Sequence, residues 1–257
     1  MAQRMQGKIA LVSGAARGQG ASHARLLAAE GAAVLCTDIL DDLGQGTVAA
    51  IRKDGGVAEF LHLDVRSSAD WEAAVGYAEK TWGKLDVLIN NAGIVAMAGV
   101  ADCSDEEWTN TIAVNQTGPF LGTRAAIPAF RRAGGGVIVN TASIQAVRSS
   151  WGYAAYQISK AAVISLTKTT AIEYGIENIR ANAVCPSAVD TAMLASEMEI
   201  FADNPYFDFE RDYLSRVPIG NRVAQPEEIS TVVLHLASDD SAFTTGLVYQ
   251  VDGGFGI

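Results

Sequence analysis

Short apolar runs alternate with longer amphipathic stretches along the whole chain, and the two patterns predict different elements. The apolar runs, rich in β-branched residues, predict strands at residues 8–13, 33–37, 58–63, 85–90, 136–142, 179–184 and 246–251. The stretches between them predict helices at about 19–30, 41–54, 68–82, 104–132, 152–175 and 226–237. Strands that alternate with helices form a parallel sheet covered on both faces. The pattern therefore predicts an α/β fold with a doubly wound parallel sheet of about seven strands.

No linker, repeat or low-complexity tract interrupts this alternation, so residues 1–257 are expected to form one domain. Residues 188–218 depart from it, because they mix acidic with aromatic residues directly after a predicted strand. Ligands bind at the carboxyl ends of strands in an open α/β sheet, so this segment is interpreted as a substrate lid. An oligomer contact is the alternative, because exposed aromatic residues also mark interfaces.

Composition and charge narrow the classes of partner. The net charge of -10 argues against nucleic acid and anionic membranes as partners. Three cysteines form no CxxC pair, which favours a reducing compartment, and three scattered histidines give no spacing for a metal site. The N-terminus lacks the order of a signal peptide and no stretch is apolar enough to span a bilayer, so a cytoplasmic protein is expected.

A glycine-rich segment, SGAARGQG at residues 13–20, directly follows the first predicted strand and opens the first helix. Glycine permits the close backbone approach that a pyrophosphate requires, and the helix directs its N-terminal N–H groups at the anion. An acid, Asp38, ends the second strand about 20 residues beyond the glycines, as a dinucleotide site requires. The residues predicted to bind the cofactor here are Gly14, Arg17, Gly18, Gln19, Gly20 and Asp38.

The same acid predicts which dinucleotide binds. A carboxylate at Asp38 accepts hydrogen bonds from a ribose diol but repels a 2′-phosphate. Arg17 is the counter-argument, because a guanidinium in the loop can neutralise that phosphate. NAD is nevertheless favoured over NADP, since the arginine is free to turn to solvent.

Two further strand ends contribute predicted cofactor contacts. Asp64 and Val65 follow the third strand, where the acid is expected to accept from an adenine amino group. Asn91, Ala92 and Gly93 follow the fourth. Each motif alone is a common strand-ending turn, but together they line the edge of the sheet where the cofactor is expected.

Tyr156 and Lys160 lie four residues apart, so a helix places the phenol and the ammonium on one face. Such pairs also occur by chance on solvated helices. Alcohol oxidation needs a base, and a phenol with a pKa near 10 becomes one when an ammonium and a nicotinamide cation favour phenolate. Lys160 is therefore expected to lower the pKa of Tyr156. Tyr153 is a poorer base because Gln157 lies four residues after it.

Ser143 ends another predicted strand and can donate to the substrate oxygen as negative charge builds there. A serine that caps the following turn is the alternative interpretation.

The whole set of motifs resembles the short-chain dehydrogenase/reductase family, and the resemblance extends from SGAARGQG through NNAG and YQISK to the C-terminal VYQVDGGFG. It implies a single-domain Rossmann-type protein with Asn115, Ser143, Tyr156 and Lys160 as catalytic residues. By the resemblance, Lys160 and Tyr156 also contact the cofactor, Asn115 holds a water that links the lysine to solvent, and a homotetramer forms. Pro186, Val189 and Thr191 match the segment that contacts the nicotinamide in the family.

One position departs from the family pattern: Ser187 follows Pro186 where the family usually has glycine. Serine loses the freedom of positive φ, so the local loop geometry and the fit of the substrate are in question.

The residues expected to surround the substrate are Ile94, Val95, Gln145, Tyr153, Ser187 and the 188–218 lid. This wall is mainly apolar and no arginine or lysine is placed in it, so a neutral alcohol or ketone is favoured over an anion. We expect a secondary alcohol on a ring or hydrophobic skeleton, of the kind that hydroxysteroid and cyclic-alcohol dehydrogenases of the family oxidise.

Three alternatives remain at this point. A sugar dehydrogenase fits the same chemistry. A 3-oxoacyl thioester reductase is disfavoured by Asp38 and by the acidic charge, because it would usually need NADPH and a basic docking patch. An NAD-binding sensor or scaffold would have no need for Ser143, Tyr156 and Lys160 together.

Overall fold

The computed structural model describes residues 3–201 and 208–257 of the protein. In these residues seven parallel strands form one sheet in the order β3-β2-β1-β4-β5-β6-β7. The strands are β1 (Ile9–Ser13), β2 (Ala33–Asp38), β3 (Val57–His62), β4 (Val87–Asn90), β5 (Gly136–Thr141), β6 (Ile179–Pro186) and β7 (Val248–Val251). All seven predicted strands are confirmed. The strand order reverses between β1 and β4, which is where an open α/β sheet binds its ligand.

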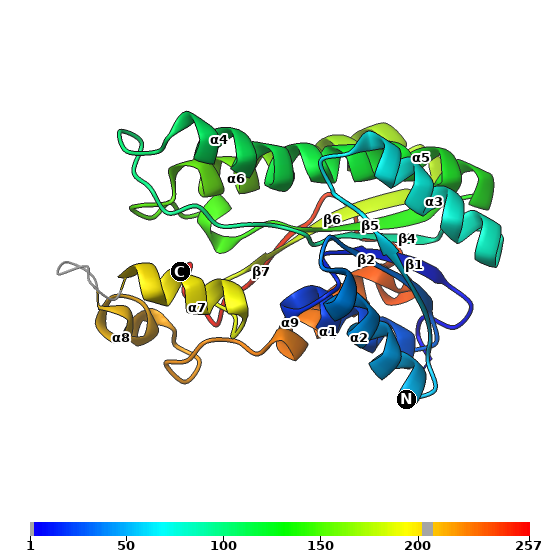
Figure 1. Ribbon diagram of the computed structural model, residues 1–257, viewed down its shortest axis with the longest axis horizontal. Coiled ribbons are helices and arrows are strands. Elements are labelled where there is room, and N and C mark those ends of the chain that lie inside the picture. Colours follow the sequence, from blue (N-terminus) through cyan, green and yellow to red (C-terminus); the bar gives the residue numbers. More distant parts are fainter. Residues whose placement is uncertain (1–2, 202–207) are drawn as a thin grey trace.

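Helices cover both faces of the sheet (Figure 1). One layer contains α1 (Gly18–Ala29), α2 (Asp41–Lys53) and α9 (Pro226–Ala237), and the other contains α3 (Ser68–Trp82), α4 (Asp105–Ile112), α5 (Gly118–Ala133) and α6 (Ala154–Tyr174). β1 supplies both cores, because Ala10 and Val12 pack in one cluster while Ile9 and Leu11 pack in the other. None of the helices described is both long and apolar enough to cross a membrane.

The predicted helix at 104–132 is interrupted. α4 begins at a capping box between Ser104 and Glu107, and a π-helical turn, η1 (Ala113–Thr117), separates it from α5. The prediction of one continuous helix was therefore wrong. A π turn shifts the side chains that follow around the helix axis, and this one contains the fully buried Asn115.

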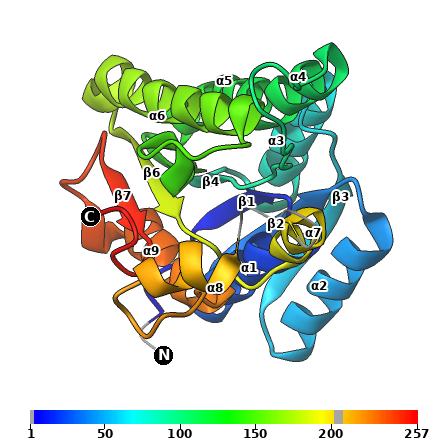
Figure 2. The ribbon, with the colours of Figure 1, turned by 90° about the vertical axis from the view of Figure 1, so that its left-hand side faces the viewer.

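The 188–218 segment forms α7 (Ala192–Phe201), α8 (Phe209–Asp212) and the short 3₁₀ turn η4 (Leu214–Arg216), while residues 202–207 of the predicted lid lie outside the described residues. In both ribbon views α7 and α8 lie on the side of α1 and α9 rather than on that of α4 and α6 (Figures 1 and 2). Three other 3₁₀ turns are η2 (Ile144–Ala146), η3 (Gly175–Glu177) and η5 (Asp239–Ser241).

His23 of α1 is fully buried against α9. Its Nδ1 lies 2.8 Å from the Oγ of Ser230, whose hydroxyl in turn donates to Ser22, while Nε2 has no hydrogen-bond partner. Burial lowers the pKa of His23 to about 3. An imidazolium here would carry a second N–H with no acceptor, so the folded protein holds the ring neutral.

We therefore expect His23 to make folding sensitive to mild acid. Its pKa is lower in the folded chain than the ordinary 6.5, so the unfolded chain binds more protons and stability falls as the pH drops below 6.5. The free energy of unfolding should decrease by about 2 kcal/mol between pH 7.5 and pH 5 through this group. Urea unfolding of the wild type and of His23→Gln at the two pH values isolates this contribution, because Glu197, whose pKa is raised to about 7, changes stability in the opposite direction over this range.

His23→Gln should reduce that decrease, whereas His62→Gln is the matched control because His62 is exposed and pairs with Asp41. Carboxyl groups with a lowered pKa, such as Glu30, reduce the free energy of unfolding only below about pH 4.5. An unchanged pH dependence in His23→Gln would contradict the assignment.

Candidate active site

A cavity of about 780 Å³ lies at the carboxyl edge of the sheet, between the glycine loop, the start of α6 and the lid. It brings together nearly all of the predicted site residues. Those that line it are Gly14, Arg17, Gly18, Gln19, Asp38, Asp64, Val65, Asn91, Ala92, Gly93, Ile94, Ser143, Gln145, Tyr153, Tyr156, Lys160, Pro186, Ser187, Val189 and Thr191. The cavity lining does not include Gly20, Val95 or Asn115.

The glycine loop is packed so tightly that side chains cannot replace its glycines. Gly14 has φ of +67°, and a β-carbon there would lie 2.7 Å from the Cα of Ala92. A β-carbon at Gly20 would overlap the carbonyl oxygen of Gly14. The loop therefore packs directly against the end of β4, with α1 beginning immediately after it at Gly18.

Asn91 holds this loop in place. Its Nδ2 donates to the carbonyl oxygens of Ser13 and Gly14 at 3.1 and 3.2 Å. The Oγ of Ser13 accepts from the backbone N–H groups of Asn91 and Ala92. Sequence reasoning missed the structural role of Ser13, although its place at the end of β1 was the available signal.

Asp38 is held by two backbone amides. Its Oδ2 accepts from Ala16 N at 3.0 Å and its Oδ1 accepts from Leu40 N at 3.1 Å. The carboxylate is thus oriented at the cavity wall and keeps acceptor capacity on both oxygens. Arg17 is exposed to solvent at the start of α1.

The carboxylate of Asp64 is engaged by a neighbouring side chain that the sequence analysis did not consider. Arg66 donates through Nε and Nη2 to Asp64 at 2.6 to 3.0 Å, and these hydrogen bonds lower the pKa of that carboxyl group. Arg66 also lines the cavity, beside the predicted adenine position.

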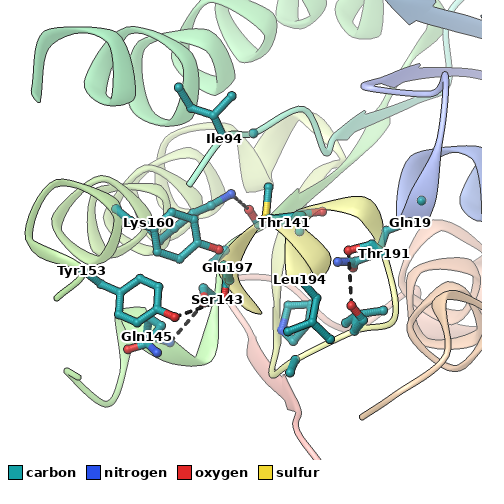
Figure 3. Close-up of a pocket in the computed structure, with 18 of the residues that line it drawn as sticks. Gln19, Ile94, Thr141, Ser143, Gln145, Tyr153, Lys160, Thr191, Leu194 and Glu197 are labelled. Atoms are coloured by element: carbon teal, nitrogen blue, oxygen red, sulfur yellow. Dashed lines mark hydrogen bonds between the residues drawn. The ribbon is translucent and has the colours of Figure 1, made fainter. Parts of the chain in front are cut away.

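Tyr156, Ser143 and Lys160 meet inside the cavity. A side-chain hydrogen bond joins Ser143 and Tyr156. The ammonium Nζ of Lys160 lies 5.8 Å from the centre of the Tyr156 ring and donates to the carbonyl oxygen of Thr141 at 2.8 Å (Figure 3). The i, i+4 spacing on α6 therefore places both groups on one face, as predicted from the sequence.

The electrostatics differ from the sequence prediction. Desolvation raises the pKa of Tyr156 to about 12, although the hydrogen bond with Ser143 acts in the opposite direction. Burial lowers the pKa of Lys160 to about 8. The expected lowering of the phenol pKa by Lys160 is not seen in the chain alone, because the loss of hydration dominates the shift.

Asn115 lies behind Lys160 rather than in the cavity. Its side chain exchanges hydrogen bonds with the backbone of Ile94 at 2.9 and 2.8 Å and donates to Ser159 at 3.2 Å. A β-carbon at Gly93 would lie 3.3 Å from both the Asn115 Oδ1 and the Lys160 Nζ, so the two side chains flank the same point. The π turn thus anchors α6 beside Lys160.

Ser187 does not strain the loop as its departure from glycine suggested. It is not among the described non-glycine residues with positive φ. Its side chain hydrogen-bonds with Tyr213, whose hydroxyl also accepts from Ala188 N at 2.5 Å. The serine therefore ties the end of β6 to the lid.

The expectation of a substrate wall without cations was wrong. Arg148, five residues after Ser143, lines the cavity together with Arg216 of the lid. The loop after η2 folds back over the site, which linear spacing did not reveal. Both guanidinium groups lie over the ring of Phe255, at 5.1 and 5.6 Å from its centre.

Glu197 and Phe255 were also missed. Five positions of α7 line the cavity, Ala192, Met193, Leu194, Glu197 and Met198, and the spacing of the last four marks one helical face that a periodicity search of the lid would have identified. Phe255 comes from the DGGFG motif, which the sequence analysis used only for recognition of the family.

The site fits a dinucleotide on the chemistry of its own residues. Gly14 and Gly20 leave no room for side chains, Gly18 has a positive φ of +56°, and Asp38 offers oriented acceptors to a ribose. Three residues of the lining carry a buried polar atom with no hydrogen-bond partner among the described residues: Gln19 Oε1, Thr141 Oγ1 and Gln145 Oε1. Among the described residues no group of His, Cys, Asp or Glu side chains is placed to hold a metal ion.

Comparisons with known proteins agree with this geometry. Residues 14–256 match the family model described as enoyl-(acyl carrier protein) reductase. The chain is 43% identical to trans-4-hydroxycyclohexanecarboxylate dehydrogenase of Sinomonas cyclohexanicum, over 99% of this chain and 95% of that protein. It is 41% identical to 3-alpha-(or 20-beta)-hydroxysteroid dehydrogenase of Mycobacterium tuberculosis, over 99% and 91%.

Cyclopentanol dehydrogenase of Comamonas sp. is 42% identical over 98% of each chain. Among solved structures, a putative short-chain dehydrogenase/reductase from Burkholderia xenovorans superposes with a TM-score of 0.90 at 31% identity, covering 98% of this chain and 97% of that one. These similarities extend over the sheet, the glycine loop and the lid alike.

We expect Gly20→Ala to abolish dinucleotide binding and to lower stability by about 1–3 kcal/mol, because the new methyl group overlaps backbone that cannot move away cheaply. Gly46→Ala is the matched control. Gly46 lies in the exposed part of α2 with open space around its β-position, so alanine should stabilise by about 0.5–1 kcal/mol. Calorimetric titration with NAD and thermal unfolding measure both effects, and wild-type affinity in Gly20→Ala would contradict this geometry.

Proposed function

Because the chain belongs to the short-chain dehydrogenase/reductase family, and is therefore a nicotinamide-dependent oxidoreductase that acts on CH–OH groups, we propose that it uses NAD to oxidise a neutral cyclic secondary alcohol to the ketone. The observation that carries the proposal is the meeting of Ser143, Tyr156 and Lys160 in one cavity with the glycine loop and Asp38. A protein that only sensed NAD would gain nothing from this proton-transfer set.

Tyr156 exchanges the proton of the substrate hydroxyl, and Ser143 orients the same oxygen. A bound nicotinamide would supply the acceptor for the hydride of the carbinol carbon. Ser143 hydrogen-bonds Tyr156 and therefore can donate to the substrate oxygen from the same side as the phenol. In the ketone-reducing direction, the raised pKa of Tyr156 keeps the phenol protonated and ready to donate.

Lys160 stabilises the phenolate of Tyr156 and passes protons between it and the interior of the protein. Its ammonium is oriented by the Thr141 carbonyl oxygen, and its lowered pKa means that it can lose a proton more readily than a solvated lysine. Asn115, which flanks the same point near Gly93, continues the route away from the cavity. We assign it the positioning of a water that exchanges protons with Lys160.

NAD is favoured by the oriented carboxylate of Asp38. Its two oxygens already accept from the amides of Ala16 and Leu40, so it cannot swing away from a cofactor that brings negative charge. The hydroxyl groups of a ribose diol can donate hydrogen bonds to this carboxylate, whereas a 2′-phosphate has no such donor. The side chain of Arg17 is exposed, so it can turn to solvent.

The proposed substrate is a ring alcohol. Three relatives at 41–43% identity bear the names of dehydrogenases for cyclic alcohols or hydroxysteroids. Ile94, Met193 and Leu194 supply apolar surface along the cavity, which suits a hydrocarbon ring. A 3-oxoacyl thioester reductase is disfavoured by Asp38 and by the net charge of -10, and the same charge disfavours the acyl carrier protein that the family description names.

We also propose that the protein is a homotetramer and that 188–218 acts as a lid. In support, α6 exposes two large apolar side chains, Ile158 and Ile172, of which the second is 84% exposed. The lid residues that line the cavity would shield a bound substrate from water.

Tyr156→Phe should bind NAD as the wild type does and lose at least about a hundredfold in turnover, because it cannot exchange the proton. Tyr174→Phe on the same helix is the matched control, since Tyr174 packs with Arg131 and does not line the cavity. Nicotinamide absorbance with cyclopentanol or cyclohexanol follows the reaction. If Tyr156→Phe retains turnover and Tyr153→Phe loses it, the group that exchanges the substrate proton is Tyr153 and not Tyr156.

Asp38→Ala should shift the ratio of kcat/KM for NAD to that for NADP toward NADP by about tenfold or more, because the repulsion of the 2′-phosphate is removed. Asp41→Ala removes the same charge three residues later, from an exposed position, and should leave the ratio unchanged. An unchanged ratio in Asp38→Ala would show that the acid only caps its strand.

A further inference from the structure

Besides Asp212, which forms an ion pair with the neighbouring Arg211, the lid segment carries another acidic side chain, Glu197, into the cavity. Glu197 lies on the face of α7 that lines it, beside Leu194 and Met198, and its Oε2 accepts a hydrogen bond from the Tyr153 hydroxyl at 3.0 Å (Figure 3). Tyr153 is buried at the start of α6. The carboxylate therefore lies inside the substrate chamber, bonded to the element that also carries Tyr156.

The position of Glu197 is close to the reacting centre. The rings of Tyr153 and Tyr156 lie 6.1 Å apart, and Tyr213 of the lid stands near the same carboxylate. The negative charge of Glu197 also contributes to the raised pKa of Tyr156. A substrate whose reacting oxygen sits at Tyr156 will thus bring its other substituents within the neighbourhood of Glu197.

The Glu197 carboxylate loses hydration in this cavity, and its hydrogen bond with Tyr153 offsets only part of that loss. Burial raises the pKa of Glu197 to about 7, while the hydrogen bond from Tyr153 acts in the other direction. A carboxylate has acceptor sites for about four hydrogen bonds, and loss of hydration without replacement is expensive. A ligand that donates to it recovers that loss.

Gln145 provides a second hydrogen-bond acceptor in the same cavity. It independently indicates that the ligand carries a hydrogen-bond donor. Gln145 lines the cavity, and its buried Oε1 has no hydrogen-bond partner among the described residues. Ser143 and Tyr156 provide for the reacting oxygen, so they leave this acceptor unexplained. Gln145 also lies next to Ser143, because its backbone N–H donates to the Ser143 Oγ at 3.1 Å (Figure 3).

Two of the cationic side chains that line the cavity, Arg148 and Arg216, are engaged away from Glu197. Arg148 and Arg216 both lie over the Phe255 ring, and Arg148 Nη1 donates to the Phe255 carbonyl oxygen at 2.6 Å. Phe255 is stacked in turn on Tyr213. These guanidinium groups hold the C-terminal segment against the lid and do not neutralise Glu197 by an ion pair.

We propose that Glu197 and Gln145 accept hydrogen bonds from a second hydroxyl group of the substrate, so that the preferred substrate is a cyclic diol rather than a simple cyclic alcohol. The inference rests on the proposed function, because it assigns the reacting hydroxyl to Tyr156 and Ser143. Glu197 is then a specificity-determining residue that contacts the part of the substrate that does not react. It also disfavours substrates that bring a negative charge to this end of the chamber.

The experiment compares kcat/KM for cyclohexanol with that for the cyclohexane-1,2-, 1,3- and 1,4-diols, in the wild type and in Glu197→Leu and Glu197→Gln. At least one diol should exceed cyclohexanol by about tenfold or more in the wild type, as expected for a hydrogen bond to a charged acceptor. Glu197→Leu should abolish this preference while cyclohexanol oxidation persists. Glu197→Gln keeps a carbonyl acceptor and should retain part of the preference.

Glu199→Gln is the matched control, because Glu199 lies on the same helix, is exposed and does not line the cavity. It should leave the diol preference unchanged. Thermal unfolding and NAD titration of every variant separate a specificity change from misfolding, because a correctly folded variant keeps the wild-type affinity for NAD.

Three outcomes overturn the inference. The role of Glu197 is refuted if the wild type shows no preference for a diol, or if folded Glu197→Leu keeps the full preference. Turnover of cyclohexanol in either case still supports the proposed function. If the wild type prefers 4-hydroxycyclohexanecarboxylate and Arg148→Gln loses that preference, the substrate is an anion that Arg148 binds, not a neutral diol. NAD binding without turnover of any of these alcohols overturns the proposed function as well.

Discussion

The close packing of the turn after β1 against the end of β4 is the constraint on which the rest of the site depends. Gly14 and Gly20 leave no space between the loop and its neighbours, and Asn91 and Ser13 join the two strand ends by hydrogen bonds. The contact occurs where the strand order reverses, between β1 and β4. Because the loop is held so near the sheet, α1 directs its free N–H groups into the cavity and Asp38 stands at its rim.

Desolvation sets the electrostatics of the opposite half of the cavity. The same exclusion of water raises the pKa of Tyr156, lowers that of Lys160 and raises that of Glu197. Each group is therefore shifted toward its neutral form by the chain alone. The site consequently gains most from partners that bring complementary charge or hydrogen bonds, which is the physical basis for both proton exchange at Tyr156 and recognition of a donor by Glu197.

Local spacing accounts for the parts of the site that were predictable. The Tyr156 and Lys160 pair needs only the period of a helix, and the glycine loop with Asp38 needs only a strand, a turn and the next strand. The π turn at Asn115 was not predictable from periodicity, because the segment reads as one continuous helix and only its contacts with Ile94 and Ser159 require the extra residue. The substrate wall was the least predictable, since Arg148, Glu197 and Phe255 come from three separate segments.

By itself the sequence determined the parallel sheet, and it predicted the glycine loop and the pairing of Tyr156 with Lys160 on one helix face, because each depends on residues that are neighbours along one strand, turn or helix. Tertiary structure alone decided which side chains meet across the cavity and in which direction their pKa values move. The reason is physical: hydration and the distances between distant segments control those quantities, and neither is encoded in local periodicity. Glu197 illustrates the difference, being an ordinary surface acid in the sequence and a buried acceptor opposite Tyr153 in the fold.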